Sequence, residues 1–260
     1  RNRKHSLWRT NLDMEKIVNG LWIGESLSTL QIISINSWIK NGFEFNLYTY
    51  EDVENVPSDV NLKDANDIID EDKIFRYKDT GHVINGKPFG EGSVAGFSDW
   101  FRATLLYQQG GTWVDMDVVC LQPFDIQDDY FFVKQNHVGN ELSIATCFIY
   151  VKEKKSKVFE EWLNRIERLG HRLQDISWGD IGPDMLTDIV NDKSLYYFVQ
   201  DKKTFCPIDY QDYYKIWTED LNLKDSFGIH LWNAMWEQYE IDKEGNYTDS
   251  FFDKLKQMYL

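Results

Sequence analysis

The sequence predicts an α/β fold in which a mostly parallel sheet is flanked by helices. The first observation is a strand, a helix and a second strand in succession within residues 16–50, because parallel strands need a crossover helix between them. The second is the length of 260 residues, which allows one elaborated domain or two small ones with a buried core. The third is a content of 42% hydrophobic and 15% aromatic residues, unlike that of disordered chains. We expect a single domain over residues 1–260, with residues 1–15 as an N-terminal extension.

The strand, helix and strand at the start rest on three segments. Residues 16–24, KIVNGLWIG, are rich in β-branched and apolar residues, which favours a strand. Apolar residues then recur at helical spacing over 27–39, with Ser26 or Ser28 as the N-cap. Residues 43–50 are largely aromatic and apolar and predict the second strand.

The middle of the chain predicts a loop followed by further helices and strands. Residues 80–96 contain five glycines around Pro88, which indicates a mobile loop rather than a helix or strand. Residues 97–109 have apolar positions one turn apart and precede a glycine pair, which predicts a helix and its end. Residues 112–121 are β-branched and apolar apart from two aspartates and predict one strand. We also expect strands over 131–134 and 144–151 and a helix over 156–170 with a serine cap.

The charge of the chain excludes one class of partner. There are 28 Lys and Arg against 43 Asp and Glu, a formal net charge of −15. This charge opposes a phosphate backbone, so we expect no nucleic-acid partner. The longest uncharged run, residues 26–39, is too short and too polar for a bilayer span of about 20 apolar residues. We expect no transmembrane segment and leave peripheral contact with a membrane open.

The cysteines and the start of the chain bear on location. Three widely spaced cysteines without a CxxC pair fit reduced thiols, which favours a cytoplasmic location, with the inner face of the membrane as a variant. A glycosylation sequon at Asn246 keeps the lumen of the secretory pathway as the alternative. No apolar run follows the basic residues after Arg1, so we expect no signal peptide in this segment, and an upstream trimming fits the missing Met.

The central chemical feature is the pair Asp115 and Asp117 in GGTWVDMDVVCLQPF. Two residues apart on the predicted strand, both side chains project from the same face. Two like charges there are costly unless a cation or hydrogen-bond donors neutralise them, and carboxylate oxygens suit Mg²⁺ or Mn²⁺ shared with a phosphate. The pair predicts a metal–diphosphate site, with a solvated turn as the alternative, since D-x-D is frequent by chance.

Several motifs in order resemble the retaining glycosyltransferases of family 32, whose core the large clostridial glucosylating toxins share. The blocks are LWIG, SW with a following LYTY, DANDII, FSDWFR, GG, VDMD, GPDMLT and HLWNAMW. They cover most of the chain. The resemblance implies a GT-A fold, a Rossmann-like α/β domain in which a sugar nucleotide lies across the C-terminal edge of the sheet and is bound through Mn²⁺ or Mg²⁺.

The resemblance assigns roles to four residues around the acid pair. Asp117 matches the acid that holds the metal, and Asp115 matches the acid that reaches the ribose and sugar, and the metal through water. Asp99 and Arg102, at i and i+3 on one helix face, match a pair that orients the hydroxyl-rich sugar. A surface ion pair, which stabilises little, is the alternative for these two.

The remaining site residues come from both ends of the chain. Trp22 matches an aromatic residue that stacks on the nucleotide base, with core filling as the alternative. His230, with Trp232 and Asn233, lies in the block that implies a C-terminal loop over the diphosphate, and a neutral imidazole suits Mn²⁺. A structural histidine is the alternative. Asp184 matches a candidate for the reacting face of the sugar, although an acid at a helix start also favours the helix dipole.

These observations predict a metal-dependent retaining glycosyltransferase. It would move a hexose or N-acetylhexosamine from a nucleoside-diphosphate sugar, with UDP as first choice, to a hydroxyl of a glycan or glycolipid. The residues expected to act in catalysis are Asp115, Asp184 and Arg102. Those expected to bind the donor are Trp22, Asp99, Arg102, Asp115, Trp232 and Asn233, and those expected to bind metal are Asp115, Asp117 and His230.

Two segments are expected to act as lids, and two other functions stay open. Residues 80–96 and the loop around 230–233 should be open without ligand and should close over the bound donor to exclude water. A haloacid-dehalogenase-type phosphatase is one alternative, because residues 115–119 fit its DxDx[T/V] motif. A non-catalytic sugar-nucleotide-binding protein is the other.

Overall fold

The computed structural model describes residues 16–78, 81–84, 86–137 and 140–260. Its centre is a seven-stranded sheet of order β10-β8-β9-β6-β1-β2-β3. The strands are β1 (Ile17–Leu21), β2 (Glu44–Thr49), β3 (Asn61–Asp64), β6 (Gly111–Val114), β8 (Tyr130–His137), β9 (Asn140–Val151) and β10 (Val199–Gln200). Four of the six neighbouring pairs are parallel, and β9 runs antiparallel to both β6 and β8. The predicted α/β class with a mostly parallel sheet is confirmed.

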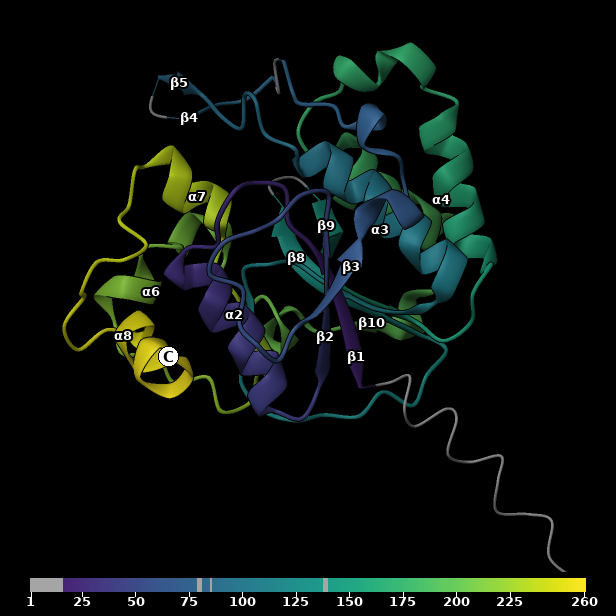
Figure 1. The fold of residues 1–260 in the computed structure, drawn as a ribbon. Coiled ribbons are helices and arrows are strands. Elements are labelled where there is room, and N and C mark those ends of the chain that lie inside the picture. The colour runs from purple at the N-terminus through teal and green to yellow at the C-terminus, as the bar shows by residue number, and fades with distance from the viewer. Residues whose placement is uncertain (1–15, 79–80, 85, 138–139) are drawn as a thin grey trace, which may run out of the picture.

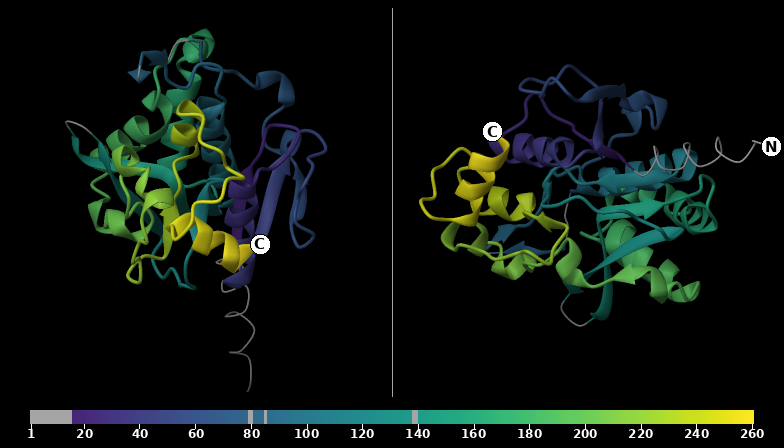
Figure 2. Two further views of the ribbon diagram at one scale, coloured as in Figure 1. Left: turned by 90° about the vertical axis from the view of Figure 1, so that its left-hand side faces the viewer. Right: turned by 90° about the horizontal axis from the view of Figure 1, so that it is seen from below.

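Helices cover both faces of this sheet (Figure 1). α2 (Thr29–Lys40) lies on one side, and α3 (Ala95–Gln109) and α4 (Lys157–Glu167) lie on the other. The later helices are α5 (Met185–Asp192), α6 (Lys215–Thr218), α7 (Asn233–Gln238) and α8 (Phe251–Tyr259). The C-terminal α8 packs beside α2 (Figure 2). Among the described residues, no helix has the length and apolar character that crossing a bilayer requires.

Short elements connect these layers. Two small antiparallel sheets pair β4 (Val83–Ile84) with β5 (Lys87–Pro88) and β7 (Val118–Cys120) with β11 (Gly228–His230). Single helical turns are η1 (Ala65–Asp67), η2 (Glu71–Lys73), η3 (Gly170–Gln174), η4 (Asp180–Asp184), η5 (Tyr196–Phe198), η6 (Lys202–Thr204) and η7 (Tyr210–Asp212).

The alternation of side chains along β2 shows how the sheet joins two cores. Phe45 and Leu47 point to the α2 face and pack in the cluster that contains Trp38. Tyr48 points to the opposite face, where its ring lies edge-on to Phe101 of α3 at 5.7 Å between centroids. Each large apolar side chain buried in this way stabilises the fold by about 1.5–3 kcal/mol. Both faces of the strand are therefore buried, as a parallel sheet requires.

The helix ends agree with the predicted caps. α2 begins after Ser28 rather than Ser26, and the Ser28 N–H donates to Gln31 Oε1 at 3.1 Å. α4 begins after Ser156, whose side chain accepts from the Val158 N–H, as predicted. Gly110 follows α3 with a φ of +69°, a conformation that few residues other than glycine adopt. Each cap satisfies a backbone group that the helix leaves without a partner.

The prediction that residues 80–96 contain no regular element is wrong. β4 and β5 form a hairpin there, and Gly86 takes a φ of +73° in the connection between them. α3 already begins at Ala95, and Gly96 is buried against the rings of Tyr77 and Phe75. Gly86 thus serves a turn and Gly96 a close helix contact, whereas the sequence analysis interpreted these glycines as signs of a mobile loop. Positions 80 and 85, like the predicted extension 1–15, lie outside the described residues.

Candidate active site

The strand order reverses between β1 and β6. From β1 the chain proceeds to β2 and β3 on one side, whereas β6, which is parallel to β1, lies on its other side. Ligands of open α/β sheets bind outside the carboxyl ends of the strands, where the strand order reverses. Trp22 directly follows β1 and Asp115 directly follows β6. Both residues therefore lie at the edge where a ligand is expected.

The acid pair lies in a turn and not in a strand. β6 ends at Val114, and β7 begins at Val118 in a different sheet, so the predicted single strand over 112–121 is wrong. The Val118 N–H donates to the Asp115 carbonyl oxygen at 3.1 Å, which closes the acid turn, residues 115–117. The predicted reason for a shared face, strand alternation, does not apply. The turn itself brings the two carboxylates to the same place.

Asp115 is held by two donors that sequence reasoning did not connect to it. Arg102 Nη1 lies 3.1 Å from its Oδ1, and Trp113 Nε1–H donates to the same oxygen at 2.8 Å. The side chain of Asp115 is 22% exposed and that of Arg102 only 5%. Burial raises the pKa of the Asp115 carboxyl, although Arg102 opposes the change. Asp115 is thus fixed in orientation while one side stays open to solvent.

Asp117 faces the C-terminal part of the chain. Its Oδ2 lies 3.1 Å from His230 Nε2 and accepts the Asn233 N–H at 2.7 Å. Burial acts to raise the pKa of Asp117, but His230 holds it below its usual value. Burial acts to lower the pKa of His230, yet Asp117 raises it well above its usual value. The pair therefore behaves as an ion pair that favours the ionised acid.

Three potential ligand atoms converge at the acid turn. One carboxylate oxygen each from Asp115 and Asp117 and one ring nitrogen of His230 lie within 4.8 Å of one another. Carboxylate oxygen with imidazole nitrogen is a donor set suited to Mn²⁺, and carboxylate oxygen alone suits Mg²⁺. Asp115, Asp117 and His230, the residues predicted to bind metal, are thus neighbours. The assignment of that role stays a prediction.

Asp99 and Arg102 form a buried pair rather than a surface one. Their side chains are 8% and 5% exposed, with 3.4 Å between Asp99 Oδ1 and Arg102 Nη1, so the alternative of a weak surface ion pair is wrong. Arg102 also donates to the Thr146 carbonyl oxygen at 2.7 Å and to Ser98 Oγ at 2.9 Å. Burial raises the pKa of Asp99 to about 6 although Arg102 opposes it. Most of the Arg102 donors are engaged within the protein, which suits a positioning role toward Asp115.

Asp184 lies near this buried pair. The charge of Asp184 contributes to the raised pKa of Asp99, which places the two acids near each other. Between them, Gly182 approaches Asp99 so closely that an added Cβ would lie 2.2 Å from a carboxylate oxygen. Asp184 ends the turn η4, which contains Pro183, and α5 begins at Met185, so the acid lies at a helix start as predicted.

The segment around His230 is not a loop. His230 ends β11, which pairs with β7, and Asn233 begins α7. The loop around 230–233 was expected to be open without ligand, yet β11 already holds His230 against Asp117. Trp232 has a φ of +59°, its ring centroid lies 3.9 Å from that of His230, and its Nε1–H donates to the Ile208 carbonyl oxygen at 2.8 Å.

Trp22 is half-buried beside the cluster of the α2 face. Its Nε1–H is buried and has no hydrogen-bond partner among the described residues. The cluster against which Trp22 packs contains Met116 of the acid turn. Base stacking stays a prediction for this residue, and core packing accounts for part of its surface.

Sequence reasoning missed two groups near the site. Trp113 and Thr146 hold Asp115 and Arg102, and neither stands out in a single sequence. Cys147 and Cys206 were interpreted as separate thiols, yet their Sγ atoms lie 3.7 Å apart next to His230. Because 59 residues separate them, no local spacing signal could have paired them.

Comparisons with known proteins identify two conserved regions. Residues 61–169 match the family model described as capsular polysaccharide synthesis protein. Residues 151–251 match the model described as the α1,4-glycosyltransferase conserved region. The first region contains the acid turn and the second contains His230, so each half of the candidate site lies in a matched segment.

Individual known proteins are also similar to parts of the chain. A human α-1,4-N-acetylglucosaminyltransferase is 23% identical over 154 residues, which cover 53% of this chain and 42% of that protein. The chain thus spans less than half the length of this curated relative. The solved PaToxG glycosyltransferase has a TM-score of 0.47 and 16% identity, over 72% of this chain and 75% of that one. A solved transferase mutant has a TM-score of 0.43 and 13% identity, over 72% and 87% of the two chains.

The family matches confirm the resemblance that the sequence motifs indicated. They do not favour the phosphatase alternative, for which the only support was the DxDx[T/V] pattern. Over residues 61–251 the chain is similar to capsular polysaccharide synthesis proteins and to the conserved region of α1,4-glycosyltransferases, as the resemblance in its motifs led us to expect.

Proposed function

We propose that the chain transfers N-acetylglucosamine or a related hexose from a UDP-sugar to a glycan hydroxyl, with retention of anomeric configuration and dependence on Mn²⁺ or Mg²⁺. The observation that carries the proposal is the convergence of Asp115, Asp117 and His230 at the strand-order reversal, within the matched regions. A sugar diphosphate carries charge that a divalent cation neutralises, and oxygen and imidazole ligands fit that cation.

The metal fits the residues that are present. Asp117 and His230 would hold it directly, and Asp115 would reach it or the sugar, because their ligand atoms lie within 4.8 Å of one another. When bound, the cation would stabilise negative charge on the departing diphosphate. Asn233 fixes the Asp117 carboxylate through its backbone N–H, so little reorientation is needed when a ligand arrives.

The protein side of the reaction is supplied by the residues of α3 and η4. Arg102 orients Asp115 through the 3.1 Å ion pair, and Trp113 holds the same oxygen. We assign the face of the sugar to Asp99 and Asp184. The pKa of Asp99 is raised mainly by burial, and Asp184 is near enough to add to that effect. Trp22, with its unpartnered indole N–H at the end of β1, is the candidate for contact with the base.

The sugar and the linkage rest on the human relative. Its name specifies transfer of N-acetylglucosamine in an α1,4 linkage. UDP-N-acetylglucosamine is itself an α-linked donor, so an α-linked product corresponds to retention. A glycan or glycolipid hydroxyl is the proposed acceptor.

The proposal is tested by incubating the protein with UDP-N-acetylglucosamine, UDP-glucose or UDP-galactose, Mn²⁺ and a panel of glycan acceptors. We expect UDP release together with a glycosylated product whose linkage is α by NMR, and loss of both with EDTA. Asp117→Asn should lose transfer, whereas Asp128→Asn, a matched change at an exposed acid outside the site, should retain it. Metal-independent transfer, or phosphate release from an aryl phosphate without sugar transfer, would overturn the proposal.

A further inference from the structure

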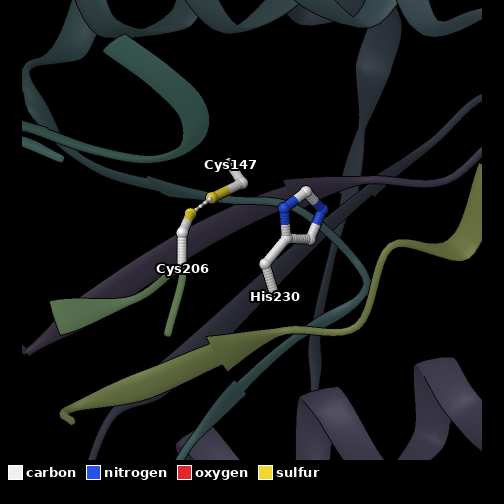
Figure 3. A group of neighbouring side chains, drawn as sticks. All are labelled: Cys147, Cys206 and His230. Carbon is white, nitrogen blue, oxygen red and sulfur yellow. Dashed lines mark hydrogen bonds between the residues drawn. The ribbon is translucent and has the colours of Figure 1, made fainter. Parts of the chain in front are cut away.

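A second group of ligand atoms lies directly behind the acid turn. Cys147 of β9, Cys206 after η6 and His230 of β11 point toward one another (Figure 3). One ligand atom from each lies within 4.8 Å of the others, and the two Sγ atoms are 3.7 Å apart. Both cysteines are at most 2% exposed. Three elements far apart in the sequence thus bring two thiols and an imidazole together in the interior.

The imidazole of His230 has its two nitrogens in unlike surroundings. Nε2 lies 3.1 Å from Asp117 Oδ2. Nδ1 lies on the side of the two sulfurs, is buried, and has no hydrogen-bond partner in the described part of the chain. A buried polar atom without a partner is costly and calls for a ligand. A histidine that binds a metal through one nitrogen commonly donates its other N–H to a carboxylate, as His230 does to Asp117 here.

The spacing of the sulfurs fits a tetrahedral metal ion. Zn–S bonds of about 2.3 Å at a tetrahedral angle place two sulfurs about 3.8 Å apart. The observed distance is 3.7 Å, well beyond the S–S bond of about 2.05 Å in a disulfide. The stacked rings of Phe148 and Phe205, adjacent in sequence to the two cysteines, have centroids 4.0 Å apart and keep the surroundings apolar. Thiolates in such surroundings select Zn²⁺ over the harder Mg²⁺ or Mn²⁺.

We propose that Cys147, Cys206 and His230 Nδ1 bind one Zn²⁺ ion, with the fourth coordination position open. On binding, the two thiols release their protons to solvent and coordinate as thiolates. The ion is distinct from the divalent cation proposed beside Asp115 and Asp117, because its ligands are two sulfurs and His230 Nδ1 in place of carboxylate oxygens. His230 Nε2 either donates its N–H to Asp117 or, once it has lost that proton, binds the other cation, so the two ions lie on opposite sides of one ring. The inference does not depend on the proposed transfer reaction.

The test uses Co²⁺ as a spectroscopic substitute for Zn²⁺. The full chain is purified with a chelator and a non-thiol reductant, titrated with Co²⁺, and followed by absorbance. We expect about one equivalent of Co²⁺ to produce a thiolate-to-cobalt charge-transfer band that added Zn²⁺ abolishes. Carboxylate ligands produce no such band, so Co²⁺ at the acid turn does not interfere.

Three cysteine variants locate the ion. The band should disappear in Cys147→Ser and Cys206→Ser and persist in Cys120→Ser, the control at the other buried cysteine, whose thiol bonds to the Gln122 carbonyl oxygen at 3.4 Å. Absence of the band in the wild type, or its persistence in either of the first two variants, would overturn the proposal. In case a variant misfolds, alkylation of the wild type supplies a second readout. Zn²⁺ should slow modification of Cys147 and Cys206 at least tenfold but leave the rate at Cys120 unchanged. If Zn²⁺ changes the rate at none of the three cysteines, the proposal is also overturned.

Discussion

The two sides of the candidate active site stabilise their carboxylates in opposite ways. On the α3 side, formed by Asp99, Arg102 and Asp115, a single guanidinium faces two acids, of which Asp99 is buried and Asp115 is 22% exposed, and the effect of burial on their pKa values is larger than that of Arg102. On the β11 side, formed by Asp117, His230 and Asn233, one acid faces an imidazole and a backbone N–H. The pKa values of Asp99 and Asp115 are raised, whereas that of Asp117 is lowered.

This difference in pKa indicates that the two acids of the D-x-D pattern, Asp115 and Asp117, serve different tasks. An acid that must stay ionised to bind a cation needs a neighbour that favours its charge, as Asp117 has. Acids with raised pKa values that face a neutral, hydroxyl-rich sugar can exchange protons or hydrogen bonds closer to neutral pH. We therefore expect the β11 side to govern metal binding and the α3 side to govern the sugar.

The largest effect is expected on the β11 side. Asp117→Asn keeps the shape of the side chain but removes the charge, so metal-dependent transfer should fall at least 1,000-fold, about 4 kcal/mol. Asp115→Ala should lower metal-dependent transfer nearly as much. The measurement is kcat/KM with UDP-sugar and Mn²⁺, alongside circular dichroism as a control for folding. Wild-type kcat/KM in well-folded Asp117→Asn would contradict the metal role.

The next effect concerns the packing of the α3 side. Gly182→Ala would place a Cβ 2.2 Å from an Asp99 carboxylate oxygen, so Asp99 or η4 must move. We expect a loss of about 3 kcal/mol in the free energy of unfolding, in the range of overpacked cores. Urea denaturation measures it. In Gly42→Ala the added Cβ meets nothing within 4 Å and the only cost is strain at a φ of +87°, whereas Gly182 has a φ of −99° and no such strain. A loss of unfolding free energy no greater than that of Gly42→Ala would show that η4 moves away from Asp99 at little cost.

A pH series sharpens the contrast between the two sides. The Asp99 pKa of about 6 lies above its unfolded value, so the folded state binds this proton more tightly. Its contribution to stability is therefore present at low pH and is lost as the pH rises from about 4 to about 6. The difference in unfolding free energy between the wild type and Asp99→Asn should change by about 2 kcal/mol over that range. A constant difference across the series would contradict the raised pKa.

The smallest effect is expected from a conservative change. Arg102→Lys keeps the positive charge but cannot reproduce the contacts to Asp115, Ser98 and the Thr146 carbonyl oxygen together. We expect kcat/KM to fall at least tenfold, about 1.4 kcal/mol, mostly through kcat. Arg168→Lys, at an arginine near the end of α4, is the matched control. Unchanged kinetics in Arg102→Lys would remove its positioning role.

The sequence was most informative where a local pattern and the fold agree. The β1, α2 and β2 unit and the caps at Ser28 and Ser156 follow from periodicity and side-chain chemistry within a few residues. The acid pair was found through its motif, although the reason given, strand alternation, was wrong because β6 stops at Val114. The residues before and after the acid turn are both apolar, and this pattern does not show that the two halves belong to different sheets.

The parts that sequence reasoning missed depend on long-range pairing. β11 joins β7 across more than a hundred residues, so the placement of His230 against Asp117 follows from topology and not from spacing. The same applies to Cys147 and Cys206, which meet only because β9 and the segment after η6 pack together. The prediction of a loop without regular elements over residues 80–96 was wrong for a different reason. Glycine occurs in turns, at close contacts and in flexible segments, so its presence does not distinguish among them.

The break between β6 and β7 has a mechanical consequence. The acid turn is the shortest of the chain connections between the main sheet and the small sheet that β7 forms with β11. Because only three residues connect β6 to β7, a displacement of the small sheet relative to the main sheet changes the backbone torsions of the acid turn, whereas the other connections are longer. The distance between the two carboxylates therefore depends on the relative position of the two sheets. A crosslink between the sheets would fix that distance.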